Sequence, residues 1–259
     1  MSATLYCDSF SALLPEGIIT PAGTRPWNTG QAGPADVTRE QVLDKPYLSF
    51  GKLSLPDRLA FSAASLVLSA CPVAERESSG ISLGLPAGSL STDLRYMESV
   101  LAGFPSPAVF SATLPSSAIA DIAIFFGLKG ENRVIAGGAG SGIVALDCAC
   151  TMLAAGKASS VIVLSVNAVE AKDFSSPLLP ADLDRENRAY AFLLSLQPRP
   201  GGLACAFTAS FGPSNKDLPH ECGELYFYQL IKLLRDRSGG SVECSAPGIS
   251  GRLAISRNA

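Results

Sequence analysis

The pattern of hydrophobic and polar positions predicts helices and strands in alternation up to about residue 166. Apolar residues three and four apart, as at Leu94, Met97 and Leu101, are typical of a helix with one apolar face. The unbroken apolar run from Ser160 to Val166 instead predicts a strand that is covered on both faces. This alternation predicts a parallel sheet sandwiched between helices, and therefore an α/β fold.

Capping residues and glycines predict where these elements begin and end. Ser54, Pro56 and Asp57 are typical of the first turn of a helix, and a largely apolar run follows them. The expected helices cover Leu59–Cys71, Thr92 to Gly103, Ile119 to Gly127, Ile143–Ala155 and Glu224–Arg237. The expected strands are Thr4 to Cys7, Ile81–Leu85, Arg133–Ala136, Ser160–Val166, Ala189–Leu196, Leu203–Phe211 and a small pair at Ser241–Cys244 and Leu253–Ser256. After the first strand, which ends at Cys7, we expect a loop that extends to Pro34.

The densest glycine cluster lies where a predicted strand leads into a predicted helix. The turn consists of Gly137, Gly138, Ala139, Gly140, Ser141 and Gly142. Glycine permits a sharp turn and a close approach of the backbone. The helix that follows directs its free N–H groups and a partial positive charge at the turn. Such a turn can bind a phosphate, or it can activate a nucleophile and stabilise an oxyanion.

Neither nucleotide-binding motif fits this turn. A dinucleotide fingerprint needs glycines at relative positions one, three and six. Counting from Gly138 puts Ile143 at the sixth position, and counting from the residue before it puts Ala139 at the third. A phosphate loop needs a lysine, and there is none between Lys129 and Lys157. We therefore consider acyl transfer instead.

Composition narrows the classes of function further. Hydrophobic residues make up 47% of the chain and charged residues 17%, which favours burial of part of the exterior against a partner. The absence of a Lys/Arg run argues against nucleic-acid binding. No signal peptide and no apolar stretch of membrane-spanning length is visible, so we expect a cytoplasmic protein. Seven scattered cysteines and one histidine form no metal-ligand pattern, so we expect no metal and no cofactor.

The stretch from Ile81 to Val169 resembles the β-ketoacyl synthases of the thiolase superfamily. The resemblance implies a thiolase-like layered α-β-α fold in a single domain, 1–259. In this domain, 1–169 would form a complete N-terminal half and 170–259 a reduced C-terminal half. The segments that carry the resemblance are Phe110-Ser-Ala-Thr-Leu-Pro-Ser-Ser117, Ile122-Ala-Ile-Phe-Phe-Gly-Leu-Lys-Gly130, Gly137 to Leu146, Ala155-Gly-Lys-Ala and Val161-Ile-Val-Leu-Ser-Val-Asn167.

The residues that the family uses for catalysis are mostly missing. The family's turn reads Thr-Ala-Cys-Ser-Ser-Gly or similar, and alignment on Val144-Ala-Leu146 places its cysteine at Ala139. Ketosynthase chemistry needs a thiolate, and an alanine side chain has no heteroatom. The family also uses two histidines, whereas this chain has only His220, whose context weakly resembles the family's Gly-His-x-x-Gly segment. We do not expect this chain to catalyse condensation by itself.

The other candidate residues have simpler structural interpretations. We expect Ser141 to cap the helix or to fill space. It is a poor candidate for a nucleophile, because the sequence offers no plausible base to activate it. Cys148 and Cys150 fall within a predicted helix, where packing is the usual role of a cysteine. His220 is expected to cap or to hydrogen-bond rather than to catalyse.

A family member without its nucleophile resembles a chain-length factor, the inactive homologue that some systems pair with an active ketosynthase. Such a subunit helps to shape the acyl tunnel at the interface of a two-fold dimer. We therefore expect a ketosynthase partner, in fatty-acid, polyketide or polyene-type biosynthesis, with an acyl carrier protein as a further candidate. By analogy, the contact would involve the strand near Val109 and Phe110, with Ile119 and Phe126 on the helix that follows.

Two other functions stay open at this point. A degenerate enzyme of the same superfamily would carry displaced acyl-transfer or hydrolase chemistry, dependent on Ser141 or His220. A homodimeric protein that binds acyl groups or acyl carrier proteins would use the fold without any chemistry. Co-purification with a ketosynthase and formation of a covalent acyl adduct are the observations that separate these hypotheses.

Overall fold

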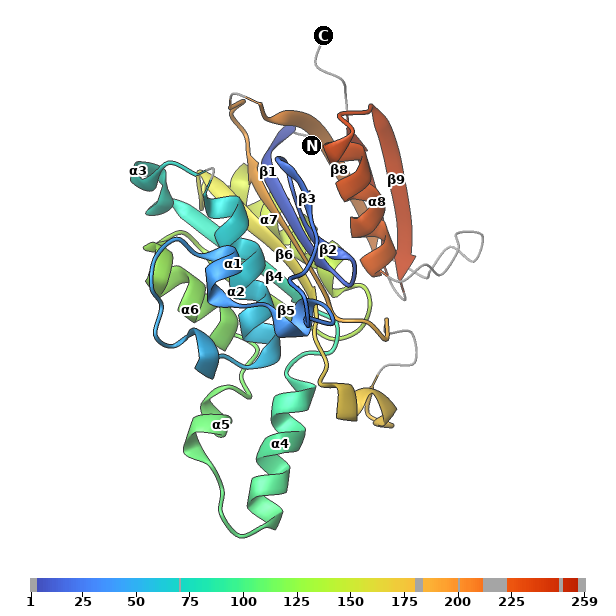
Figure 1. The fold of residues 1–259 in the computed structure, drawn as a ribbon. Helices are drawn as coiled ribbons and strands as arrows, with labels where there is room; N and C mark the ends of the chain where they lie inside the picture. Colours follow the sequence, from blue (N-terminus) through green and yellow to red (C-terminus); the bar gives the residue numbers. More distant parts are fainter. Residues whose placement is uncertain are drawn as a thin grey trace.

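A computed structural model describes residues 4–69, 71–179, 184–199, 201–211, 223–246 and 249–255. Figure 1 shows one twisted sheet running through the molecule, with helices packed on both of its faces. Helices α4 and α5 project away from this body. The predicted α/β class is therefore confirmed, with helices layered on both faces of the sheet.

Within the described residues, ten strands form a single mixed sheet. Its order is β5-β4-β6-β7-β1-β8-β10-β9, and β2 and β3 form a hairpin beside β1. Strands β4, β5 and β6 are parallel, and the other pairs are antiparallel. The strands are β1 (Leu5–Leu14), β2 (Gly17–Thr20), β3 (Gly23–Arg25), β4 (Ser79–Leu85), β5 (Asn132–Ala136), β6 (Ser160–Asn167), β7 (Arg188–Ser195), β8 (Leu203–Phe211), β9 (Gly240–Ala246) and β10 (Ile249–Ile255).

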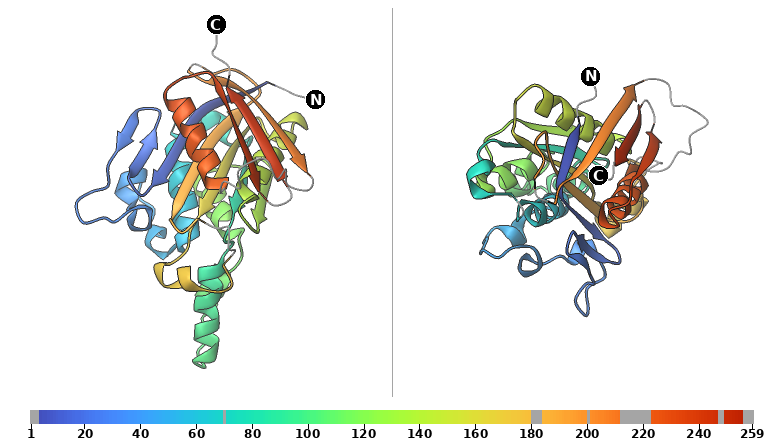
Figure 2. Two further views of the ribbon diagram at one scale, coloured as in Figure 1. Left: turned by 90° about the vertical axis from the view of Figure 1, so that its right-hand side faces the viewer. Right: turned by 90° about the horizontal axis from the view of Figure 1, so that it is seen from above.

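The helices divide between the two faces of the sheet. Helices α2 and α6 belong to one buried apolar cluster, and α7 and α8 belong to the other. Helix α7 contacts β4 and β6 on one side and β8 and β10 on the other, so it lies between two parts of the folded sheet (Figure 2). The helices are α1 (Arg39–Val42), α2 (Leu55–Leu68), α3 (Val73–Arg76), α4 (Leu90–Leu101), α5 (Pro107–Ser111), α6 (Ser117–Phe126), α7 (Ser141–Ala154) and α8 (Gly223–Arg235), with short 3-10 helices at Pro34–Asp36, Phe50–Lys52 and Ala171–Ser175.

The chain forms few regular elements after residue 195, where β7 ends. Five neighbouring strands of the sheet come from the part of the chain between Leu5 and Ser195. In their order across the sheet, they are β5, β4, β6, β7 and β1. Among the described residues that follow, only β8, α8, β9 and β10 are regular elements. This short set agrees with a reduced C-terminal half, although a division at residue 169 stays a prediction.

Several predicted elements are confirmed. Helix α2 begins directly after Ser54, whose hydroxyl oxygen accepts a hydrogen bond from the Asp57 amide at 3.3 Å. Strands β4, β5, β6, β7 and β8 lie within two residues of their predicted bounds. Helices α6, α7 and α8 also lie where they are predicted. Strands β9 and β10 are each longer than predicted, and Ser256 lies outside the described residues.

The prediction for the N-terminal segment is wrong in extent. Strand β1 continues beyond Cys7 to Leu14, and the expected loop contains the β2–β3 hairpin. The polar residues Ser9 and Ser11 suggest a loop, but both are buried. The Ser11 hydroxyl donates to the carbonyl of Ala63 at 2.9 Å, so a contact distant in sequence satisfies this buried polar group.

The prediction of a strand at Val109 and Phe110 is also wrong. These residues lie in α5, which begins after Ser106 and has Pro107 at its first position. The Ser106 hydroxyl oxygen accepts a hydrogen bond from the Val109 amide at 3.4 Å. A serine cap followed by proline is a helix-start signal, and it outweighs the apolar character of these two residues.

Candidate functional site

The glycine turn joins the carboxyl end of β5 to the first residue of α7. Gly137 and Gly138 have φ angles of 137° and 77°, a region that side chains other than glycine rarely adopt. Their amides donate to the carbonyls of Leu85 (3.3 Å) and Pro86 (3.0 Å), at the end of the neighbouring parallel strand β4. The sequence thus needs glycine at these positions to bring the turn against the carboxyl edge of the sheet.

Helix α7 begins without a side-chain cap. Gly140 stands at the cap position, and it has no side chain that could accept a hydrogen bond from the first-turn amides. Ser141 is buried, and its hydroxyl donates to the carbonyl of Gly138 at 2.8 Å. The space-filling interpretation of Ser141 therefore fits the structure, whereas the capping interpretation does not.

Ala139 lies in the turn immediately before the helix, and only 7% of its surface is exposed. Its side chain is a methyl group, and its neighbours in the turn are glycines except for Ser141. Within residues 137–142, the Ser141 hydroxyl is thus the one side-chain heteroatom, and it is already engaged with a backbone carbonyl. The turn therefore contains no thiol.

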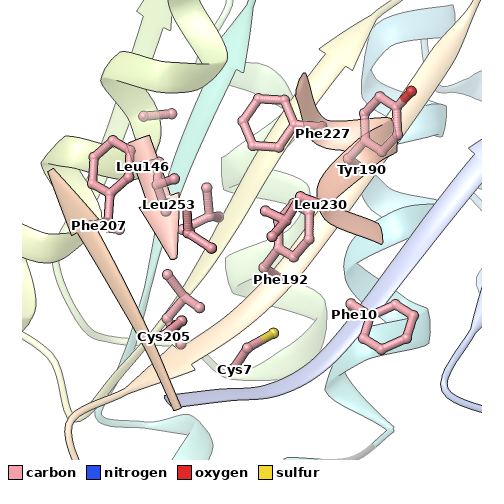
Figure 3. Close-up of a cluster of buried hydrophobic side chains, with 14 of the residues drawn as sticks. Cys7, Phe10, Leu146, Tyr190, Phe192, Cys205, Phe207, Phe227, Leu230 and Leu253 are labelled. Atoms are coloured by element: carbon pink, nitrogen blue, oxygen red, sulfur yellow. The ribbon is translucent and has the colours of Figure 1, made fainter. Parts of the chain in front are cut away.

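The inner side of the first turn of α7 is tightly packed. A Cβ on Gly142 would lie 2.4 Å from the Ser165 hydroxyl oxygen and 2.5 Å from a ring carbon of Phe227. The Phe227 ring centroid lies 5.8 Å from that of Tyr190 and 5.7 Å from that of Phe192 (Figure 3). All three aromatic side chains are buried. Large aromatic groups therefore fill the interior directly behind the turn.

Helices α4 and α5 with their connection and flanking residues, 90–114, form a projecting segment that we call the arm (Figures 1 and 2). The arm packs little of its surface on the body: α4 buries only Ser91 and Thr92, and α5 buries no residue. Its large apolar side chains are instead exposed, and Leu101 and Phe104 are 82% and 83% exposed. The others are Met97, Val100, Phe110 and Leu114.

Strand β5 is the second feature of this side of the molecule. It ends the strand order, and in the described part of the chain it pairs only with β4. Its other edge therefore presents backbone hydrogen-bonding groups, which is the usual template for pairing with another strand. Ile124, on the α6 helix that precedes β5, is 82% exposed.

Comparison with known proteins supports one family. Residues 58–176 match the family model for the N-terminal domain of β-ketoacyl synthases. A search of curated protein sequences found no match. This segment, which is less than half of the chain, is similar to ketosynthases. The matched segment includes β4, the arm, β5, the glycine turn and α7, so the family likeness coincides with the candidate site.

Solved structures of low sequence identity extend the likeness in fold over nearly the whole chain. A ketosynthase in complex with its chain length factor from Xenorhabdus doucetiae matches with a TM-score of 0.67 and 18% identity, over 97% of this chain and 99% of that one. The ishigamide ketosynthase/chain length factor matches with a TM-score of 0.73 and 16% identity, over 97% and 99%. A β-ketoacyl synthase from Burkholderia phymatum matches with a TM-score of 0.69 and 11% identity, over 100% of both chains. At sequence identities this low, the matches establish the fold alone.

None of the cysteines whose side chains the structure describes lies within residues 137–142. Cys148 and Cys150 lie within α7, beyond its first turn, and both are partly buried. Burial raises the pKa of the Cys150 thiol to about 12, and it does the same for Cys205 in β8. Cys7 is also buried, and its pKa is raised for the same reason. These buried thiols stay protonated near neutral pH and pack as apolar groups.

The predicted interface residues are divided between surface and interior. Val109 and Phe110 lie on the arm, and Phe110 is exposed. Ile119 is buried with α2 and α6, and the Phe126 ring lies 5.5 Å from that of Phe61. The structure thus adds exposed arm residues that family analogy did not single out. The sequence signal for them was the apolar stripe of α4, which is also what a core-facing helix shows.

Other predicted features of the site stay as predictions. His220 lies outside the described residues, so its role is untested. No group of three or more potential metal-ligating side chains occurs among the residues that the structure describes. In the same part of the chain, no helix is long and apolar enough to span a membrane.

Proposed function

We propose that this chain is a non-catalytic ketosynthase-like subunit that pairs with an active ketosynthase and helps to shape the acyl tunnel at their interface. The pathway would be fatty-acid, polyketide or polyene-type biosynthesis. The observation that carries this proposal is the methyl group of Ala139 in the turn before α7, where the family resemblance implies a cysteine. Without a thiol, no acyl-enzyme can form there.

The packing behind the turn supports the same interpretation. Phe227 lies against the first turn of α7, and its ring stacks with Tyr190 and lies near Phe192. Those buried rings occupy volume on the inner side of the helix. An acyl chain bounded by this subunit would therefore meet its outer surface rather than a chamber behind the turn.

The exposed apolar side chains of the arm support a protein partner. Large apolar patches on a protein surface usually mark interfaces. Strand β5 adds an open sheet edge, which can pair with a strand of another subunit. We assign the partner as a cysteine-bearing ketosynthase, because two copies of this chain would form a dimer with no nucleophile. Two of the similar solved structures are described as ketosynthases together with chain length factors.

Co-expression with a cysteine-bearing ketosynthase, followed by size-exclusion chromatography with light scattering, tests the partnership. We expect a stable 1:1 complex. Leu101→Glu and Phe104→Glu should each weaken it at least tenfold, because a charge would be buried at the interface. Leu48→Glu is the matched control, since Leu48 is 90% exposed and lies outside the arm. A wild-type chain that only self-associates through the arm would contradict the assignment.

The degenerate-enzyme alternative makes a different prediction in the same system. It requires a covalent acyl adduct on this chain, or hydrolysis that is lost on changing Ser141 or His220. The hydrogen bond from the Ser141 hydroxyl to the Gly138 carbonyl weighs against its use as a nucleophile. Ser141→Ala should therefore leave the behaviour of the complex unchanged.

A further inference from the structure

A partly buried hydrogen bond joins the two ends of the arm where it meets the body, which we call its feet. Ser89 directly precedes α4 and is buried, and its hydroxyl donates to the backbone carbonyl of Thr113, just beyond α5. The two residues are 24 positions apart, so this bond links the start of the arm to its end. A hydrogen bond inside one helix could not do this.

A second hydroxyl fixes the first turn of α4 to the body. The Ser91 hydroxyl oxygen accepts a hydrogen bond from the Glu170 amide at 2.9 Å. Leu90 packs beside it in a small apolar cluster with Val169 and Phe174. The foot of α4 therefore rests on the segment that follows β6.

Beyond this foot, the arm has little to hold its direction. Helices α4 and α5 contact each other, and the Tyr96 and Phe110 ring centroids lie 5.2 Å apart. Within the described residues, one ion pair joins α4 to the body: the Lys172 ammonium lies 3.1 Å from the Glu98 carboxylate, and both side chains are exposed. Exposed ion pairs of this kind contribute little. The contacts at the foot must therefore set where the rest of the arm points.

We propose that Ser89 and Ser91 are positioning residues that hold the arm in the direction in which it docks on its partner. This inference rests on the proposed function. Binding costs free energy for every segment that must be ordered on association, and a segment that is already ordered avoids that cost. The two serines supply this order while leaving the apolar surface of the arm free.

We call the two hydrogen bonds of Ser89 and Ser91 the latch. Hydrogen–deuterium exchange of the isolated chain tests the latch directly, without any partner. Ser89→Ala and Ser91→Ala should each speed amide exchange in residues 93–112 by about three- to tenfold, the factor that one hydrogen bond contributes. Exchange in the β4 and α7 amides should not change. Ser111→Ala is the matched control, because the Ser111 hydroxyl donates to Ala108 within α5 and links nothing to the body.

Affinity for the ketosynthase tests the consequence of the latch. Both foot variants should weaken the complex by about three- to tenfold, with the control variant near wild type. Unchanged exchange in the foot variants, or faster exchange throughout the core, would overturn the latch. Faster arm exchange with unchanged affinity would overturn its role in docking. If wild type binds no ketosynthase, the proposed function fails, while the exchange experiment still decides whether the latch exists.

Discussion

The glycine turn and the first turn of α7 combine an unreactive side chain with close packing. Ala139 provides only a methyl group at the turn, and three residues later Gly142 lies against Ser165 and Phe227. The sequence predicted an alanine where the resemblance implies a cysteine, through alignment on Val144-Ala-Leu146, and this assignment stays a prediction. The aromatic packing could not be inferred, because Tyr190 and Phe227 are far apart in the sequence and meet only in the folded chain.

Gly142 should be intolerant of even one added carbon. Gly142→Ala would place a Cβ within 2.5 Å of Phe227 and Ser165, so the helix or these side chains must move. We expect a loss of about 1–3 kcal/mol in the free energy of unfolding, despite the better helix propensity of alanine. Urea denaturation measures this change. Gly51→Ala is the control, because its added Cβ would meet no atom within 4 Å and should change stability little.

Asp57 gives the protein a specific pH dependence. Burial raises the pKa of this carboxyl above its ordinary value of 3.8, although hydrogen bonds from Ser54 and Ser117 oppose the shift. The folded state therefore favours the protonated form, and the stability that this provides is lost as pH rises through the raised pKa. Asp57→Asn should increase the free energy of unfolding at pH 7 relative to wild type. The difference should vanish below pH 3.8; a destabilised variant at pH 7 would contradict the sign.

The arm is an element that folds onto the body only at its base. Because α4 and α5 bury almost nothing beyond Ser91 and Thr92, replacing residues 94–111 with a short Gly/Ser linker should keep the core intact. We expect the free energy of unfolding to change by no more than about 1 kcal/mol, since few buried contacts are lost. The ketosynthase complex should disappear. Circular dichroism and thermal melting would reveal an unfolded deletion variant, which would contradict this view of the arm.

At the level of elements, the sequence predicted those with strong local signals. The serine cap and apolar run of α2, the glycine end of α6 and the continuous apolar strand β6 all behaved as local rules require. Strand β1 was underestimated because its serines are buried against distant partners. The apolar stripe of α4 predicted a helix correctly, but periodicity does not distinguish a face that meets the core from one that is exposed.

At the scale of the whole molecule, the strand order could not be predicted from the chain. Strand β1 lies in the middle of the sheet, between β7 and β8, and these pairings join residues 176 to 200 positions apart. The family resemblance supplied the layered fold, and the composition added only a preference for a partner. The open edge at β5 and the exposed arm lie outside this core, and both are consistent with a subunit that is completed by another chain.

Intact-protein mass spectrometry of the ketosynthase complex tests the central claim most directly. The purified complex would be incubated with an acyl thioester donor, and the mass of each subunit would then be measured. We predict one acyl group on the cysteine-bearing ketosynthase and none on this chain, at every time point. An acyl mass on this chain, formed as fast as on its partner, would contradict the account of a non-catalytic subunit.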